Sequence, residues 1–141
     1  MTSWSYSNCG LESDALQIQS VTASPDPLDA KESSRFTIKG FAQEPIEEGA
    51  YADVVIKLGL IKILSKRFDL LEELRRDQFF TLVSPASTSP LPKGEIELTF
   101  TPPLPNPTPQ AKFSVSLRAF TVDDEDLACL DFKLDYMKRP L

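Results

Sequence analysis

The sequence contains no histidine, only two cysteines and five glycines against 12 prolines, and these shortages exclude several kinds of chemistry. Without histidine the chain cannot form a Ser-His-Asp or Cys-His catalytic group, or a histidine-ligated zinc site. Cys9 and Cys129 are too few for a four-thiolate metal centre. We therefore expect no metal ion and no cofactor.

Positive charge and long apolar runs are also scarce. The chain has 15 basic and 21 acidic residues, a net charge of −6, which argues against a nucleic-acid surface. No stretch approaches the roughly 20 apolar residues of a membrane-spanning helix. Residues Met1–Gly10 lack the basic and apolar segments of a signal peptide. If a signal peptide was removed, we expect the protein to be secreted or to lie in the lumen of the secretory pathway. The alternative is a cytoplasmic protein.

Apolar and polar residues alternate along most of the chain, which is typical of half-buried antiparallel strands. About seven such segments within 141 residues predict one all-β domain over 1–141, an immunoglobulin-like two-sheet β-sandwich. The segments are Gln17–Ala23, Arg35–Phe41, Ala50–Leu58, Leu60–Phe68, Glu95–Phe100, Lys112–Ala119 and Leu130–Tyr136.

One side of these strands is almost purely apolar and predicts the interior of the sandwich. From alternation alone, a close-packed core is the simplest interpretation. The residues expected to point inward are Phe36, Ile38, Val54, Ile56, Ile96, Leu98, Phe100, Phe113, Val115, Leu117, Leu130, Phe132 and Leu134.

Two polar segments interrupt the alternation. Asp69 can cap a helix, Glu72 follows three residues later, and acids lead bases through Arg76, so we expect a short helix of about two turns. The acidic run Asp123–Asp126 predicts a solvated hairpin turn. Calcium binding is the alternative, although the spacing matches no EF-hand loop.

Several segments in order resemble the ML family of lipid-recognition domains. Its members include the cholesterol-carrying Niemann-Pick type C proteins, the group 2 mite allergens and fungal phosphatidylglycerol/phosphatidylinositol transfer proteins, and the fungal group is the most similar. The segments are Trp4–Tyr6, Asn8–Gly10, Ser24–Leu28, Pro45–Leu64 and Leu127–Phe132. The resemblance implies an apolar cavity between the sheets, lined by the inward residues, that holds a phospholipid or a sterol reversibly.

The cysteines fit the same resemblance. The first and last cysteines of the family pair, and Cys9 and Cys129 occupy those places, which implies a disulfide; two buried thiols are the alternative. A second family disulfide has no counterpart here, because Leu71 and Ser89 stand at its positions. We therefore expect the 70–76 helix to be less constrained than in the family.

A basic cluster in this acidic chain is a candidate for binding a lipid headgroup. Lys62, Lys66 and Arg67, with Arg75 and Arg76 nearby, could contact a phosphate at the cavity mouth. The simpler interpretation is that these side chains are solvated on strand and helix surfaces.

An enzyme is the main alternative to a carrier. An apolar pocket can fold a polyene, terpenoid or polyketide and promote its cyclisation or isomerisation by orientation alone. That hypothesis needs an ionisable or hydroxyl group in the pocket, with Tyr136 and Asp53 as candidates. The carrier hypothesis needs none. It implies a monomer with transient membrane contact, and a protein receptor is a further partner that the sequence leaves open.

Overall fold

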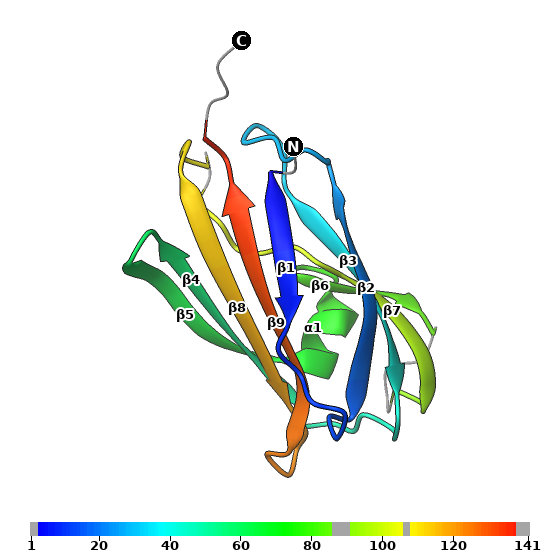
Figure 1. Ribbon diagram of the computed structural model, residues 1–141. Helices are drawn as coiled ribbons and strands as arrows, with labels where there is room; N and C mark the ends of the chain where they lie inside the picture. The colour runs from blue at the N-terminus through cyan, green and yellow to red at the C-terminus, as the bar shows by residue number, and fades with distance from the viewer. Residues whose placement is uncertain (1–2, 86–90, 106–107, 138–141) are drawn as a thin grey trace.

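The computed structural model describes residues 3–85, 91–105 and 108–137 and shows two antiparallel sheets packed face to face (Figure 1). This confirms the all-β sandwich. Within the described residues there are nine strands and one helix. Their bounds are β1 Trp4–Asn8, β2 Leu16–Ser24, β3 Arg35–Ala42, β4 Tyr51–Leu58, β5 Ile61–Asp69, α1 Leu70–Arg76, β6 Phe80–Ser84, β7 Gly94–Phe100, β8 Lys112–Phe120 and β9 Asp126–Asp135.

The strand order fixes which strands lie at the edges. One sheet has the order β1-β9-β8-β4-β5 and the other β2-β3-β7-β6. Each of the seven predicted segments coincides with a strand to within a few residues. The sequence analysis missed β1 and β6. Both are edge strands of only five residues, too short to show a clear periodic pattern, and each is hydrogen-bonded to a single neighbouring strand.

The helix α1 forms where the sequence predicts it. The carboxylate of Asp69 accepts a hydrogen bond from the backbone N–H of Glu72, and the helix ends at Asp77 in the left-handed conformation with φ 61°. Leu71, which replaces a family cysteine, is fully buried. Apolar packing therefore anchors α1 at this position. Ser89, the second replaced position, lies outside the described residues.

The predicted hairpin turn joins β8 to β9. Asp124 adopts φ 63° in this turn, and its carboxylate accepts a hydrogen bond of 2.7 Å from the hydroxyl of Tyr51. No group of three or more Asp, Glu or Cys side chains in the described ranges is arranged to hold a metal ion.

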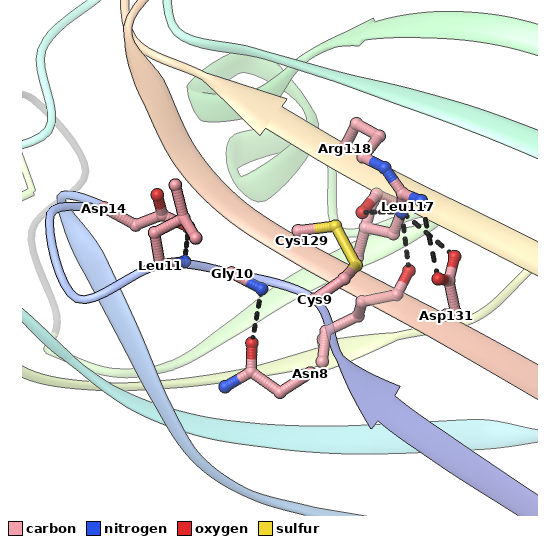
Figure 2. The surroundings of a disulfide bond; sticks show 10 residues. Asn8, Cys9, Gly10, Leu11, Asp14, Leu117, Arg118, Cys129 and Asp131 are labelled. Atoms are coloured by element: carbon pink, nitrogen blue, oxygen red, sulfur yellow. Dashed lines mark hydrogen bonds and ion pairs between the residues drawn. A yellow bond between two sulfur atoms is a disulfide. The ribbon is translucent and has the colours of Figure 1, made fainter.

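A disulfide between Cys9 and Cys129 ties the end of β1 to β9 (Figure 2). The two Cα atoms are 5.0 Å apart, and the backbone N–H of Cys9 donates to the carbonyl of Cys129. Beside it, Arg118 donates to the carboxylate of Asp131 on the same sheet. A cross-link that spans 120 residues stabilises a fold by about 4–5 kcal/mol in the chain-entropy estimate.

Candidate functional site

The interior between the sheets is the principal candidate site. All 13 side chains expected to point inward are buried there, and none exposes more than 7% of its surface. They come from β3, β4, β7, β8 and β9, so both sheets contribute. These side chains are aliphatic or aromatic, so this part of the interior offers a ligand apolar contacts rather than hydrogen bonds.

Several interior residues were missed by the sequence analysis. Phe68, Leu71, Phe80, Leu91 and Leu127 are all fully buried. The helical spacing of Leu70, Leu71 and Leu74 could have identified Leu71, because these positions share one helix face. Phe80 carried no comparable signal, since its short strand lies at an edge and does not alternate.

A line of aromatic rings crosses the interior from β3 to β5. Successive ring centroids lie 4.9, 6.0, 4.9 and 5.8 Å apart, within the range of favourable aromatic contacts. The apolar interior is therefore continuous to the side of the sandwich where β5 and β6 lie. The rings belong, in order, to Phe36, Phe132, Phe100, Phe80 and Phe68.

The two edges of the sandwich differ in how the sheets are joined. At the β1 and β2 side, the N–H of Ala15 donates to the carbonyl of Asp126, close to the disulfide. At the other side, no backbone hydrogen bond between described residues joins β5 to β6. There α1 connects the two strands and contacts both. Apart from the chain through α1, side-chain packing holds the sheets together at the β5–β6 edge.

Lys66 stands at this edge, on the inner side of β5. It pairs with Val54, whose side chain is buried, so the Lys66 side chain starts on the inner face. Its Nζ lies 4.9 Å from the ring centroid of Phe68 and 5.9 Å from that of Phe79. Both distances allow a cation–π attraction. The line of aromatic rings thus ends beside an ammonium group that remains exposed to solvent.

Lys62 and Arg67 lie on the outer face of β5. Arg67 donates to both carboxylate oxygens of Asp53, at 2.7 and 3.1 Å, and its guanidinium lies 4.2 Å from the ring centroid of Tyr51. The hydrogen bond to Asp53 raises the pKa of Arg67 further above its ordinary value. Lys62 pairs with Lys57 across the hairpin. The three residues expected at a headgroup are therefore divided between two faces.

The other two arginines of the basic cluster are engaged in ion pairs. Arg75 donates to Glu48 at 2.6 Å and to Glu72 at 3.0 Å, and Arg76 lies 3.5 Å from Glu72. The hydrogen bonds to Glu48 and then Glu72 raise the pKa of Arg75 above its ordinary value. These contacts occupy both arginines at the surface of α1.

The two residues considered for catalysis occupy different environments. Asp53 is on the outer face of β4, bonded to Arg67, and so lies away from the interior. Tyr136 is buried and its hydroxyl is hydrogen-bonded to Ser34 Oγ. Burial raises the pKa of Tyr136 above its ordinary value, while the bond to Ser34 partly offsets that effect. Of the two candidate groups, Tyr136 is therefore buried with its hydroxyl bonded to Ser34, and Asp53 lies outside the interior.

The fold and the interior together define a two-sheet sandwich with an apolar centre that reaches one edge. A family model described as the ML domain matches residues 3–136. The chain belongs to this family.

Among proteins of similar sequence, a phosphatidylglycerol/phosphatidylinositol transfer protein of Cryptococcus neoformans is 45% identical over 137 residues, covering 97% of this chain and 73% of the relative. The protein of the same name from Mycosarcoma maydis is 33% identical over 133 residues, covering 94% of this chain and 66% of the relative. The chain therefore spans about two-thirds to three-quarters of their lengths.

Two solved structures share the fold. A Niemann-Pick type C2 protein from the Japanese carpenter ant superposes with a TM-score of 0.63 at 17% identity, covering 95% of this chain and 99% of that one. Chicken MD-1 complexed with lipid IVa superposes with a TM-score of 0.51 at 20% identity and the same coverage. At these identities the likeness is one of fold.

Proposed function

We propose that this protein binds an amphipathic lipid between its two sheets and transfers it between membranes without a chemical step. The observation that carries the proposal is the apolar interior, whose aromatic line reaches the β5–β6 edge and ends at Lys66. Relatives named as phosphatidylglycerol/phosphatidylinositol transfer proteins and the structure of MD-1 with lipid IVa support it.

The ligand class follows from the chemistry of the site. The acyl chains pack against the apolar side chains of the interior. Burial of each methylene group favours binding by about 0.8 kcal/mol. The headgroup stays at the β5–β6 edge, where the Lys66 ammonium pairs with a phosphate oxygen. An anionic phospholipid is the ligand, ahead of a sterol, because a sterol offers this ammonium no charge.

The same edge provides the route of entry. Opening it breaks side-chain contacts but leaves both sheets' ladders intact, since β5 and β6 are each hydrogen-bonded only within their own sheet. At the opposite side of the sandwich, the Ala15–Asp126 hydrogen bond joins the start of β2 to β9 in the other sheet. The sheets therefore part at β5–β6, and the arriving acyl chains replace the contacts that are lost.

We also propose that the protein works in the secretory pathway or outside the cell, as a monomer that contacts membranes transiently. The Cys9–Cys129 disulfide is consistent with an oxidising compartment. Transfer needs contact with a donor and an acceptor membrane in turn, and this scheme requires no protein receptor.

A vesicle-to-vesicle transfer assay tests the proposal. The purified protein should accelerate transfer of fluorescent phosphatidylglycerol in proportion to its concentration. Lys66→Met should slow this transfer several-fold, because the phosphate loses its cationic partner. Lys39→Met makes the same change on the other sheet, away from the β4–β5 turn, and serves as the matched control. Failure of the protein to accelerate transfer of any phospholipid would contradict the proposal, and equal effects of the two variants would contradict the role of Lys66.

A further inference from the structure

The turn between β4 and β5 exposes two large aliphatic side chains. Leu60 is 99% exposed and Ile61 68% exposed. Gly59 turns the chain here with φ 62°, and apart from its two chain neighbours no described residue lies within 4 Å of the position its Cβ would take. The turn therefore projects from the sandwich and exposes apolar surface to water. Transfer of that surface to an apolar medium would be favourable.

Lysines surround this turn on the outer face of the sheet. The register of the strands aligns three of them in one row, and the row reads Lys62, Lys57, Ser114 and Lys133. Lys112 is adjacent, because its carbonyl accepts a hydrogen bond from Gly59. The ion pairs found between described residues involve none of these four lysines.

A shallow groove lies beside the same turn. It has a volume of about 380 Å³, and Gly59, Lys112, Ser114 and Lys133 are among the residues that line it. Asp135, which lies opposite Lys112 in the β8–β9 strand register, also lines the groove. Two lysines and three serines line the groove together with Asp135, and ammonium and hydroxyl groups suit a phosphate group. The groove thus offers room for a headgroup next to the aliphatic turn.

The opposite end of the sandwich is acidic. β4 runs from Tyr51, which is bonded to Asp124 at that end, to Leu58 beside the lysines, a rise of about 23 Å. In Figure 1 the β8–β9 turn lies far from the β4–β5 turn. This separation of charge orients the β4–β5 turn toward an anionic surface. The acidic residues lining the grooves at that end are Glu12, Asp14, Glu44, Glu47, Asp123, Asp124, Glu125 and Asp126.

We propose that the β4–β5 turn docks the protein on an anionic phospholipid bilayer. Leu60 and Ile61 enter the apolar boundary, and Lys57, Lys62 and Lys133 contact lipid phosphates. A protein partner fits less well, because protein interfaces are depleted in lysine and need a broad surface rather than a projecting turn. The inference rests on the proposed function, for which it supplies the membrane-facing surface.

Co-sedimentation with vesicles tests this docking. The full chain should bind vesicles of phosphatidylcholine and phosphatidylglycerol more tightly than vesicles of phosphatidylcholine alone, and added salt should weaken the binding. Leu60→Asp should lower the partition coefficient by about tenfold or more, because an apolar contact is replaced by a charge. Lys57→Glu should lower it by about fivefold or more.

Matched controls come from elsewhere on the surface. Leu11 is 62% exposed near the acidic end, so Leu11→Asp makes the same change away from the turn. Lys39 lies on the other sheet, so Lys39→Glu repeats the charge reversal there. Both controls should bind vesicles as the unmodified protein does. The inference would be overturned if Leu60→Asp bound anionic vesicles as tightly as the unmodified protein does. It would also be overturned if the unmodified protein bound both kinds of vesicle equally.

Two further measurements separate this inference from the proposed function. Loading with short-chain phosphatidylglycerol, which is monomeric in solution, should be unchanged in Leu60→Asp by native mass spectrometry. A protein that loads this lipid but does not bind anionic vesicles would overturn the docking surface and leave the proposed function standing. Sedimentation showing a dimer that Leu60→Asp dissociates would instead assign the turn to a second copy of the chain, and would also overturn the inference.

Discussion

Lys66 and Arg67 are consecutive residues, yet their side chains serve opposite faces of β5. The Nζ of Lys66 lies 4.9 Å from the ring centroid of Phe68 at the edge of the interior. Arg67 is held on the outer face by Asp53, with 2.7 Å between its Nε and the nearer carboxylate oxygen. The two charges therefore have different roles. The Lys66 ammonium is available to a ligand, and Arg67 links β5 to β4 through its ion pair with Asp53.

We predict that removing the Arg67–Asp53 pair will leave lipid transfer unchanged. Arg67→Met and Asp53→Asn each break the pair without touching the interior. The urea midpoint should shift only slightly, because an ion pair this exposed to water contributes little. Transfer and urea unfolding of both variants check this. A loss of transfer in Arg67→Met as large as in Lys66→Met would show that the headgroup binds on the outer face.

The disulfide should be a major source of stability. Replacing Cys9 and Cys129 together by serine is expected to lower the free energy of unfolding by up to about 4–5 kcal/mol, because the unfolded chain regains the freedom of a long loop. Urea unfolding of the variant and of the unmodified protein measures the difference. Equal midpoints, or two free thiols in the unmodified protein, would contradict the disulfide.

Leu71 should hold α1 in place through apolar contacts. Leu71→Ala is expected to lower the free energy of unfolding by about 2–5 kcal/mol, as for other buried leucines. Leu60→Ala removes the same atoms from a side chain that is 99% exposed, and should change the stability by less than about 0.5 kcal/mol. Thermal or urea unfolding distinguishes the two, and similar losses would contradict the burial of Leu71.

Tyr136 should make the protein less stable at alkaline pH. Its pKa is raised by burial in the folded state, so the unfolded chain loses this proton first as the pH passes about 10. The stability linked to Tyr136 is therefore present below that pH and is lost as the pH rises through the folded-state pKa. Tyr136→Phe should show a shallower fall in unfolding free energy across this range. An identical slope in the two proteins would contradict the raised pKa.

Much of this architecture is encoded in local patterns of the sequence. Strict alternation placed Phe36, Val54 and Phe132 in the interior, because adjacent residues of a strand face opposite sides. The capping residue Asp69 and the charges that follow it predicted α1. In both cases the information lies within a few residues of the feature it defines.

Other features depend on contacts that the local pattern does not carry. The apolar residues of β5 follow no simple alternation, and the β4–β5 register shifts after Ile56, which leaves Ile63 out of step. The sequence alone therefore grouped Lys62, Lys66 and Arg67 as one cluster. The partner of Arg67 lies 14 residues away across the hairpin and could be identified only once the register was known.

Native mass spectrometry tests the central claim most directly. The protein is incubated with vesicles containing phosphatidylglycerol, separated from them, and measured with its non-covalent contents intact. The account predicts a one-to-one complex with phosphatidylglycerol that is markedly reduced in Lys66→Met and unchanged in Lys39→Met. A protein that emerges free of lipid under these conditions, while folded and with its disulfide formed, would contradict the account.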